Sequence, residues 1–221
     1  ALAYWNMTNT SATNIQDLTG NNHNISIIGG FGFPKEVPGI LGTAQFKNNI
    51  TSYMNVTGNL SGLQSLNRSF SIFMWINFSN YPLPASLHQF FNMGSWSWGI
   101  QDIGDGYRFV IQNERTGIVT TQDADTPMIF PYTDGKWHYI GIVVNETNFT
   151  LYYNSTGTFT FDANKYINGN NTAIISFRDA ESNRLLNYTY DEVGIWNRTL
   201  NQTEINIIYN SGSGKSFSSI Y

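Results

Sequence analysis

The stretch of sequence that decides the fold is residues 190–200, Tyr190-Asp191-Glu192-Val193-Gly194-Ile195-Trp196-Asn197-Arg198-Thr199-Leu200. Its first part is apolar and aromatic, which predicts the end of a β-strand. A helix start follows directly, because Asn201 can act as the N-cap and Glu204 stands three positions later, as in a capping box. Leu200 and Ile205 are spaced as a hydrophobic staple across that start. The sequence therefore predicts a strand that runs into one short C-terminal helix.

Outward from this stretch, most of the chain consists of short apolar segments separated by Gly, Asn, Asp and Pro, a pattern typical of a β-sandwich. The predicted strands are residues 2–7, 24–29, 42–48, 52–57, 69–79, 88–93, 97–102, 106–112, 116–121, 136–144, 148–153, 157–161, 171–178 and 186–196. Residues 69–79 carry large apolar side chains on both faces, which indicates a central, doubly covered strand. No repeat or linker interrupts residues 1–211, so we expect one domain there and a flexible tail over residues 212–221.

The 190–200 stretch, with the Glu204 helix and Tyr209-Asn210-Ser211-Gly212 after it, resembles the laminin-G-like family of concanavalin A-like jelly rolls. Three further blocks resemble the family in the expected order: residues 3–5 with 17–21, residues 42–46 with 53–56 and 70–76, and Asp134-Gly135-Lys136-Trp137-His138-Tyr139-Ile140. The resemblance implies an all-β jelly roll sandwich of two antiparallel sheets with one short C-terminal helix. It also implies a structural role for His138. Function stays open, since such domains bind glycans, bind proteins or serve as structural units.

Fifteen asparagines open an Asn-x-Ser/Thr sequon in which x is not proline. They are Asn6, Asn9, Asn24, Asn49, Asn55, Asn59, Asn67, Asn77, Asn145, Asn148, Asn154, Asn170, Asn187, Asn197 and Asn201. Ser and Thr make up 40 of 221 residues, so the 28 asparagines would give only roughly five sequons by chance. The sequon is the acceptor for N-linked glycan on proteins that pass a secretory membrane. The excess predicts covalent N-glycans and an extracellular location, on a cell surface or a virion surface.

Two sequons stand where the chain departs from the family pattern. After Leu151-Tyr152-Tyr153 the family usually turns on Asp-Gly, whereas this chain has Asn154-Ser155-Thr156. The family commonly has Ala at the position of Thr199, which here completes the Asn197 sequon. Sequons at positions where the fold does not require them favour selection for glycan.

Composition excludes several classes of protein. The formal net charge is −4 and the basic residues are scattered, so no patch suits nucleic acid. The absence of cysteine excludes disulfides and thiolate-bound metal, and with dense sequons it is typical of an archaeal or viral surface protein. The longest aliphatic run, residues 140–144, is too short to span a bilayer, so we expect no direct membrane insertion. Any signal peptide would lie outside this sequence.

Catalytic residues are not indicated. Related jelly rolls with hydrolase activity carry a Glu-x-Asp-x-x-Glu cluster on one strand, and none of the six glutamates forms this pattern. The three histidines, His23, His88 and His138, lack the spacing of a metal site or a catalytic triad. The sequence therefore predicts a protein that is not an enzyme.

Two acidic turns give a candidate Ca²⁺ site, with ligands Asp102, Asp105, Asp123 and Asp125. A hairpin of residues 106–112 and 116–121 would bring both turns to one end, and Ca²⁺ prefers such oxygen ligands. The alternative, ordinary turn aspartates that accept local hydrogen bonds, stays open. Nearby aromatic side chains that can stack on sugar rings are Trp96, Trp98, Tyr107 and Tyr132, although Trp98 and Tyr107 fit a core position equally well.

Two functions remain at this point. The first is a structural subunit that self-associates into a filament, surface layer or virion. The residues 212–221 favour it, because Phe217, Ile220 and Tyr221 give the tail an apolar, strand-compatible tip that can add to a neighbour's open sheet edge. The second is an adhesion module that binds a glycan or a surface protein at a calcium-assisted rim. Because of this tail, we slightly favour the structural subunit over the adhesion module.

Overall fold

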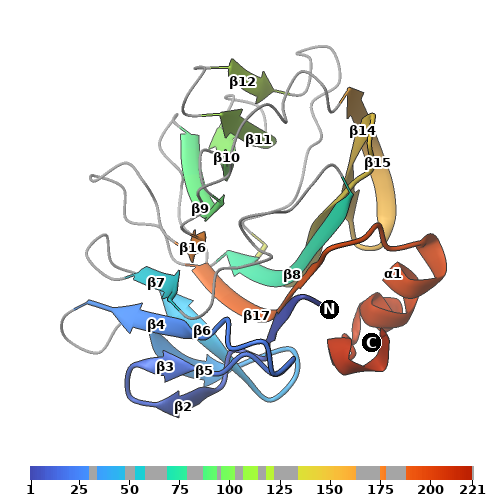
Figure 1. Ribbon diagram of the computed structural model, residues 1–221. Helices are drawn as coiled ribbons and strands as arrows, with labels where there is room; N and C mark the ends of the chain where they lie inside the picture. Colours follow the sequence, from blue (N-terminus) through green and yellow to red (C-terminus); the bar gives the residue numbers. More distant parts are fainter. Residues whose placement is uncertain are drawn as a thin grey trace.

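The computed structural model describes residues 1–29, 34–47, 53–57, 69–78, 87–93, 96–102, 107–113, 118–121, 134–162, 175–177 and 188–220. Within these residues two antiparallel sheets pack face to face (Figure 1). The order of the first sheet is β15 (Thr156–Asp162), β14 (Asn148–Tyr153), β13 (Trp137–Val144), β8 (Phe70–Phe78), β17 (Tyr188–Trp196), β6 (Thr43–Lys47) and β5 (Lys35–Pro38), and β1 (Ala3–Trp5) also pairs with β17. The order of the second sheet is β12 (Ile118–Thr121), β11 (Tyr107–Asn113), β10 (Trp96–Asp102), β9 (Leu87–Met93), β16 (Ile175–Phe177), β7 (Tyr53–Val56), β4 (Ile25–Ile28), β3 (Asn14–Ile15) and β2 (Asn9–Ser11). The predicted sandwich is confirmed.

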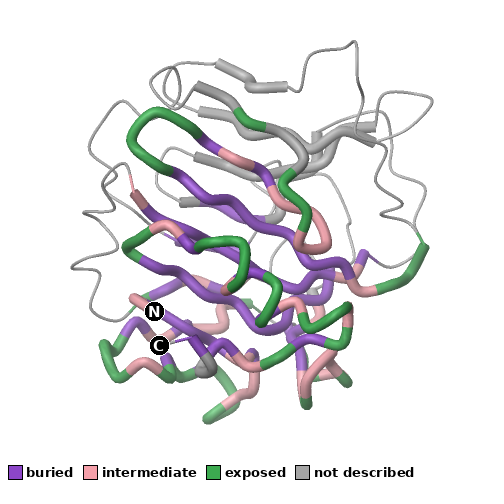
Figure 2. The backbone as a smooth tube through the Cα atoms, turned by 90° about the vertical axis from the view of Figure 1, so that its right-hand side faces the viewer, coloured by how far each residue is buried: buried purple, intermediate pink, exposed green. Residues whose placement is uncertain are grey.

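The main core lies between the sheets. It forms because side chains along each strand point alternately to the two faces of the sheet. On β8, Ile72, Met74 and Ile76 point inward and meet side chains of the second sheet such as Met54 and Phe177. The other face of β8 carries Phe73 and Trp75, which belong to a second buried cluster. Strand β8 lies between β13 and β17 and is buried on both faces, as the sequence predicted. In Figure 2 the central strands of the first sheet are buried, and many of the exposed residues lie in turns.

The outer face of the first sheet, away from the second sheet, is covered at one end by the C-terminal segment (Figure 1). This segment contains α1 (Gln202–Tyr209) and the 3₁₀ turns η2 (Asn210–Gly212) and η3 (Phe217–Ile220). The Tyr209 ring stacks on Trp75 at 5.8 Å between centroids. Ile205 and Ile208 are buried in the same cluster. Among the described residues, no helix is long and apolar enough to cross a membrane.

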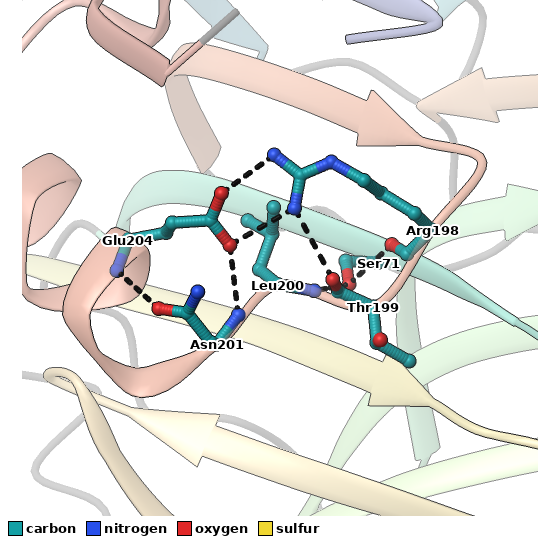
Figure 3. Close-up of polar contacts among 6 residues, drawn as sticks. All are labelled: Ser71, Arg198, Thr199, Leu200, Asn201 and Glu204. Atoms are coloured by element: carbon teal, nitrogen blue, oxygen red, sulfur yellow. Dashed lines mark hydrogen bonds and ion pairs between the residues drawn. The ribbon is translucent and has the colours of Figure 1, made fainter.

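The predicted capping box is present at the start of α1 (Figure 3). The Glu204 backbone N–H donates to Asn201 Oδ1 at 3.0 Å, and the Asn201 N–H donates to Glu204 Oε2 at 2.9 Å. Arg198 clamps the same carboxylate with two bonds of 2.6 and 2.9 Å. Ser71 on β8 holds the connecting segment, since its Oγ accepts from the Leu200 N–H at 2.9 Å. Local sequence therefore fixes the helix start, and the distant Ser71 holds the segment before it on the sheet.

The described residues 212–220 do not form the predicted strand-like tip, because they fold into 3₁₀ turns on their own domain, and the predicted flexibility of the tail stays untested. Phe217 is completely buried and Ile220 is 8% exposed, both within the chain's own second cluster. The Phe217 ring lies 5.4 Å from Tyr4 and 5.2 Å from Trp196. Gly194 explains the position, because a Cβ there would lie 2.3 Å from the Phe217 ring. The missing side chain leaves a recess that Phe217 fills, and the two chain ends lie side by side (Figure 1, Figure 2). Tyr221 lies outside the described residues.

The β14–β15 hairpin turns on two residues in left-handed conformation, Asn154 (φ 46°) and Ser155 (φ 66°). Asparagine tolerates this region better than serine does, and glycine adopts it freely. We expect Ser155→Gly to raise the melting temperature by about 2–4 °C while it preserves the Asn154 sequon. Differential scanning calorimetry measures this shift. Ser213→Gly, at φ −90°, is the control and should bring no gain. A lower melting temperature for Ser155→Gly would contradict the strain at this turn.

Candidate functional site

The outer face of the first sheet carries a pocket at the end that α1 leaves uncovered. One cross-strand row forms it, with one residue from each of five neighbouring strands: Trp137, Asn77, Thr189, Phe46 and Lys35. Val37 and Pro38 complete the lining, and the cavity volume is about 340 Å³. We call this cavity the outer pocket. Because neighbours in the row are paired in register, strand pairing alone brings segments distant in the sequence together.

The chemistry of the outer pocket combines apolar rings with polar hydrogen-bonding groups. The Trp137 indole is partly exposed, and the Lys35 ammonium lies 5.8 Å from the centroid of the Phe46 ring. Asn77 Nδ2 donates a 2.8 Å hydrogen bond to the Gly135 carbonyl, and Thr189 adds a hydroxyl-bearing side chain to the lining. A ring face beside amide, hydroxyl and ammonium groups is the combination that recognises a sugar ring and its hydroxyls.

Hydrogen bonds of the neighbouring His138 hold the wall of the outer pocket beside Trp137. His138 is buried, its Nε2 lies 2.9 Å from Asp134 Oδ1, and its Nδ1 lies 2.7 Å from the Tyr153 hydroxyl. Partial burial opposes ionisation of Asp134, but hydrogen bonds from the Lys136 N–H and from His138 lower its pKa. The structural role that the family resemblance implied for His138 agrees with these contacts.

A buried carboxylate pair lies on the same face, beneath the C-terminal segment. The consecutive residues Asp191 and Glu192 lie at a bulge in β17 and are buried, with exposures of 0% and 2%. Asp191 accepts from the Leu41 N–H at 3.0 Å, and Glu192 accepts from the Tyr4 hydroxyl at 2.6 Å. Desolvation raises the pKa of Asp191 to about 8 and that of Glu192 to about 7. The same Tyr4 hydroxyl lies 2.9 Å from Ser216 Oγ, so this pair anchors loop 39–42 and the C-terminal segment.

Sequence reasoning missed both features in different ways. No sequence pattern indicated the outer pocket, because its residues are spread from Lys35 to Thr189 and come together only through strand register. Asp191 and Glu192 did carry a signal, two adjacent acids inside an apolar strand segment. The family pattern contains both residues but implies no role for them.

Half of the predicted rim residues lie outside the described residues. Asp102 ends β10 opposite Tyr107, which begins β11. The pairing of β11 with β12 confirms the predicted hairpin, and its register places the start of β11 and the end of β12 at one end of the sheet. Asp105, Asp123, Asp125 and Tyr132 are not described, so the calcium site stays a prediction. Trp96 and Trp98 lie on β10 opposite Asn113 and Ile111, and their ligand role also stays a prediction.

None of the sequon asparagines within the described ranges is buried. Asn145, Asn148, Asn197 and Asn201 are exposed, and those of intermediate exposure are Asn6, Asn9, Asn24, Asn55, Asn77 and Asn154. The remaining sequon asparagines, Asn49, Asn59, Asn67, Asn170 and Asn187, lie outside the described residues. The exposure of the described positions therefore does not exclude attached glycans, and glycosylation itself stays a prediction.

The family model for the concanavalin A-like lectin/glucanases superfamily, Laminin_G_3, matches residues 48–206, more than two thirds of the chain. The chain belongs to this superfamily. The resemblance drawn from the 190–200 stretch and the three other blocks is thus confirmed, as is the jelly roll fold. Curated protein sequences give no match to this member of the superfamily.

Several solved structures share the fold of this concanavalin A-like chain. The binding domain of Paraclostridial Mosquitocidal Protein 1 is 22% identical with a TM-score of 0.71, covering 96% of this chain and 52% of that one. The binding domain of botulinum neurotoxin DC, in complex with rat synaptotagmin II, is 17% identical with a TM-score of 0.70, covering 95% and 51%. The botulinum neurotoxin serotype D ligand binding domain, in complex with N-acetylneuraminic acid, is 15% identical with a TM-score of 0.69, covering 94% and 50%. The chain thus spans about half the length of these structures, and the likeness is one of fold.

Proposed function

We propose that this chain is an extracellular, N-glycosylated, non-catalytic module that binds carbohydrate in the outer pocket. The observation that carries the proposal is the cross-strand row of Trp137, Asn77, Thr189, Phe46 and Lys35 around a cavity of about 340 Å³. The structural neighbours support it, because they include domains solved with a sialic acid and with a surface protein. The sequon excess and the exposure of the described sequons support the extracellular location.

The alternative, a self-assembling structural subunit, is no longer favoured by the apolar tail. It depended on a free apolar tail, and Phe217 and Ile220 are packed within their own chain. A non-catalytic role also agrees with the use of the Asp191–Glu192 pair, whose oxygens accept hydrogen bonds from Leu41 and Tyr4 in the interior.

In the outer pocket, the Trp137 indole provides the stacking surface for a pyranose ring. Stacking places the apolar C–H face of the sugar on the ring and leaves the equatorial hydroxyls directed sideways toward polar groups. Thr189 and Lys35 stand across the row from Trp137 and supply a hydroxyl and an ammonium group. The cationic group of Lys35 favours an anionic sugar over a neutral one.

We expect Trp137→Ala to weaken binding by at least about tenfold, because an aromatic anchor in a pocket contributes a large share of binding energy. A printed glycan array with neutral and sialylated saccharides selects the probe, and isothermal titration calorimetry then measures its affinity. Tyr53→Ala is the control, since Tyr53 is a partly exposed aromatic residue on the second sheet. Titrations in calcium and in EDTA test the predicted rim site separately. Equal affinity of the wild type and Trp137→Ala would refute binding in the outer pocket.

A further inference from the structure

The side-chain amide of asparagine has two ends, and only one of them takes part in N-glycosylation. Attachment forms a bond between Nδ2 and C1 of a sugar. The C1–oxygen bond of a phosphate-linked glycosyl donor breaks, and the phosphorylated carrier and one amide proton leave. Oδ1 remains a carbonyl that can still accept hydrogen bonds. A fold that uses Oδ1 of a sequon asparagine is therefore compatible with a glycan, whereas a fold that uses Nδ2 competes with one.

Several sequon asparagines in this chain are used through Oδ1. Their Oδ1 atoms accept from backbone N–H groups as follows: Asn6 from Thr8 at 3.2 Å, Asn24 from Asp17 at 2.9 Å, Asn145 from Asn148 at 2.9 Å and Asn201 from Glu204 at 3.0 Å. Because a backbone N–H can only donate, the atom that faces it must be the oxygen. Within the described part of the chain, no hydrogen bond engages Nδ2 of these four residues. Figure 3 shows this orientation at Asn201, whose side-chain oxygen is the atom that bonds to the Glu204 backbone nitrogen.

Described asparagines outside sequons use either end of the amide, and Asn206 accepts through Oδ1 from Gln202 Nε2 at 2.9 Å. Three asparagines outside sequons use the other end of the amide, with Nδ2 bonds from Asn14 to Thr10 at 3.4 Å, from Asn21 to Leu2 at 2.9 Å and from Asn210 to Gly214 at 3.0 Å. The orientation of the amide thus differs between these asparagines and the four sequon residues above.

Asn77 is a sequon residue with the opposite arrangement. Its Nδ2 donates to the Gly135 carbonyl at 2.8 Å, and a carbonyl can only accept, so the nitrogen end is fixed there. Asn77 also lies in the middle of the cross-strand row, between Trp137 and Thr189. A glycan on this nitrogen would fill the outer pocket.

We propose that the fold divides its sequons into two classes. Asn6, Asn24, Asn145 and Asn201 carry N-glycans on their free nitrogens, and Asn77 stays unmodified with its nitrogen bound to Gly135. The sugar coat is thereby kept out of the outer pocket. The proposal rests on the extracellular location proposed above.

Glycopeptide mass spectrometry of protein isolated from its native source measures the occupancy of each site. We expect high occupancy at Asn6, Asn24, Asn145 and Asn201 and an unmodified peptide for Asn77. Comparable occupancy at Asn77 and Asn145 would overturn the two classes but leave the extracellular location standing. Unmodified asparagine at every sequon would overturn the extracellular location, and the two classes with it.

An Asn→Asp series tests the same assignment without any glycan, because aspartate keeps the acceptor oxygen and replaces the NH₂ group with a second oxygen. Asn145→Asp should leave the melting temperature within about 1 °C of the wild type, since its oxygen still accepts from the backbone N–H. Asn77→Asp should lower it by about 2–4 °C, because a carboxylate oxygen then faces the Gly135 carbonyl. Both are measured at pH 7 on unglycosylated protein. Equal shifts, or a larger loss at Asn145, would contradict the assigned amide orientations.

Discussion

Replacing Phe217 with alanine should lower the free energy of unfolding by about 3–5 kcal/mol, the usual cost of truncating a fully buried phenylalanine. The side chain is 0% exposed and fills the recess above Gly194. Its ring contacts Tyr4 and Trp196, with centroids 5.4 and 5.2 Å away. The surrounding strands cannot collapse into the space, because β17 is paired on both sides, so most of the cavity would remain. Urea denaturation followed by tryptophan fluorescence measures the loss.

The same experiment separates packing within one chain from exchange of the tail between chains. If the tail packs on its own domain, unfolding of the wild type is independent of protein concentration, because no partner takes part in the equilibrium. Lys215→Ala is the control, since Lys215 is exposed two residues before Phe217 and should change stability very little. A Phe217→Ala protein as stable as the wild type, or a wild-type midpoint that rises with concentration, would show that the tail packs elsewhere.

The sequence could predict those features of the fold whose determining residues lie close together in the chain. The start of α1 was predictable, because Asn201, Glu204, Leu200 and Ile205 lie within six residues and satisfy one another's hydrogen bonds and contacts. The alternation on β8 was predictable for the same reason, since period two alone assigns each side chain to a face. Both predictions needed no knowledge of distant segments.

The tail and the outer pocket were not predictable, because distant residues decide them. An apolar tip after glycines suits an added strand as well as a folded-back turn, and only the recess at Gly194 selects the turn. The outer pocket depends on the register of five strands, and no sequence pattern places Lys35 in line with Trp137. The predicted rim residues were chosen from turn composition, which indicates where loops lie and leaves their contacts undetermined.

Stability should fall as the pH rises from 5 to 8.5, by an amount on the order of 3–5 kcal/mol, because of the buried pair Asp191 and Glu192. Desolvation raises their pKa values to about 8 and about 7, well above the ordinary values of 3.8 and 4.5. Between the ordinary and the raised values, the folded protein keeps protons that the unfolded chain has released. The folded state therefore binds more protons, and the free energy of unfolding decreases with increasing pH until both groups ionise.

The variant Glu192→Gln should remove part of this dependence. Glutamine resembles the neutral acid, and its amide can still pair with the Tyr4 hydroxyl, which bonds to the glutamate at 2.6 Å and lies 2.9 Å from Ser216. We expect the variant to lose less stability than the wild type between pH 5 and 8.5, and to equal or exceed it at the upper end. Glu146→Gln is the matched control, because Glu146 is exposed and should leave the wild-type dependence unchanged. Melting temperatures from calorimetry in a constant-ionic-strength buffer series measure both curves. Parallel curves for the wild type and Glu192→Gln, or a wild type more stable at pH 8.5 than at pH 5, would show that Glu192 is ionised in the folded protein throughout this range.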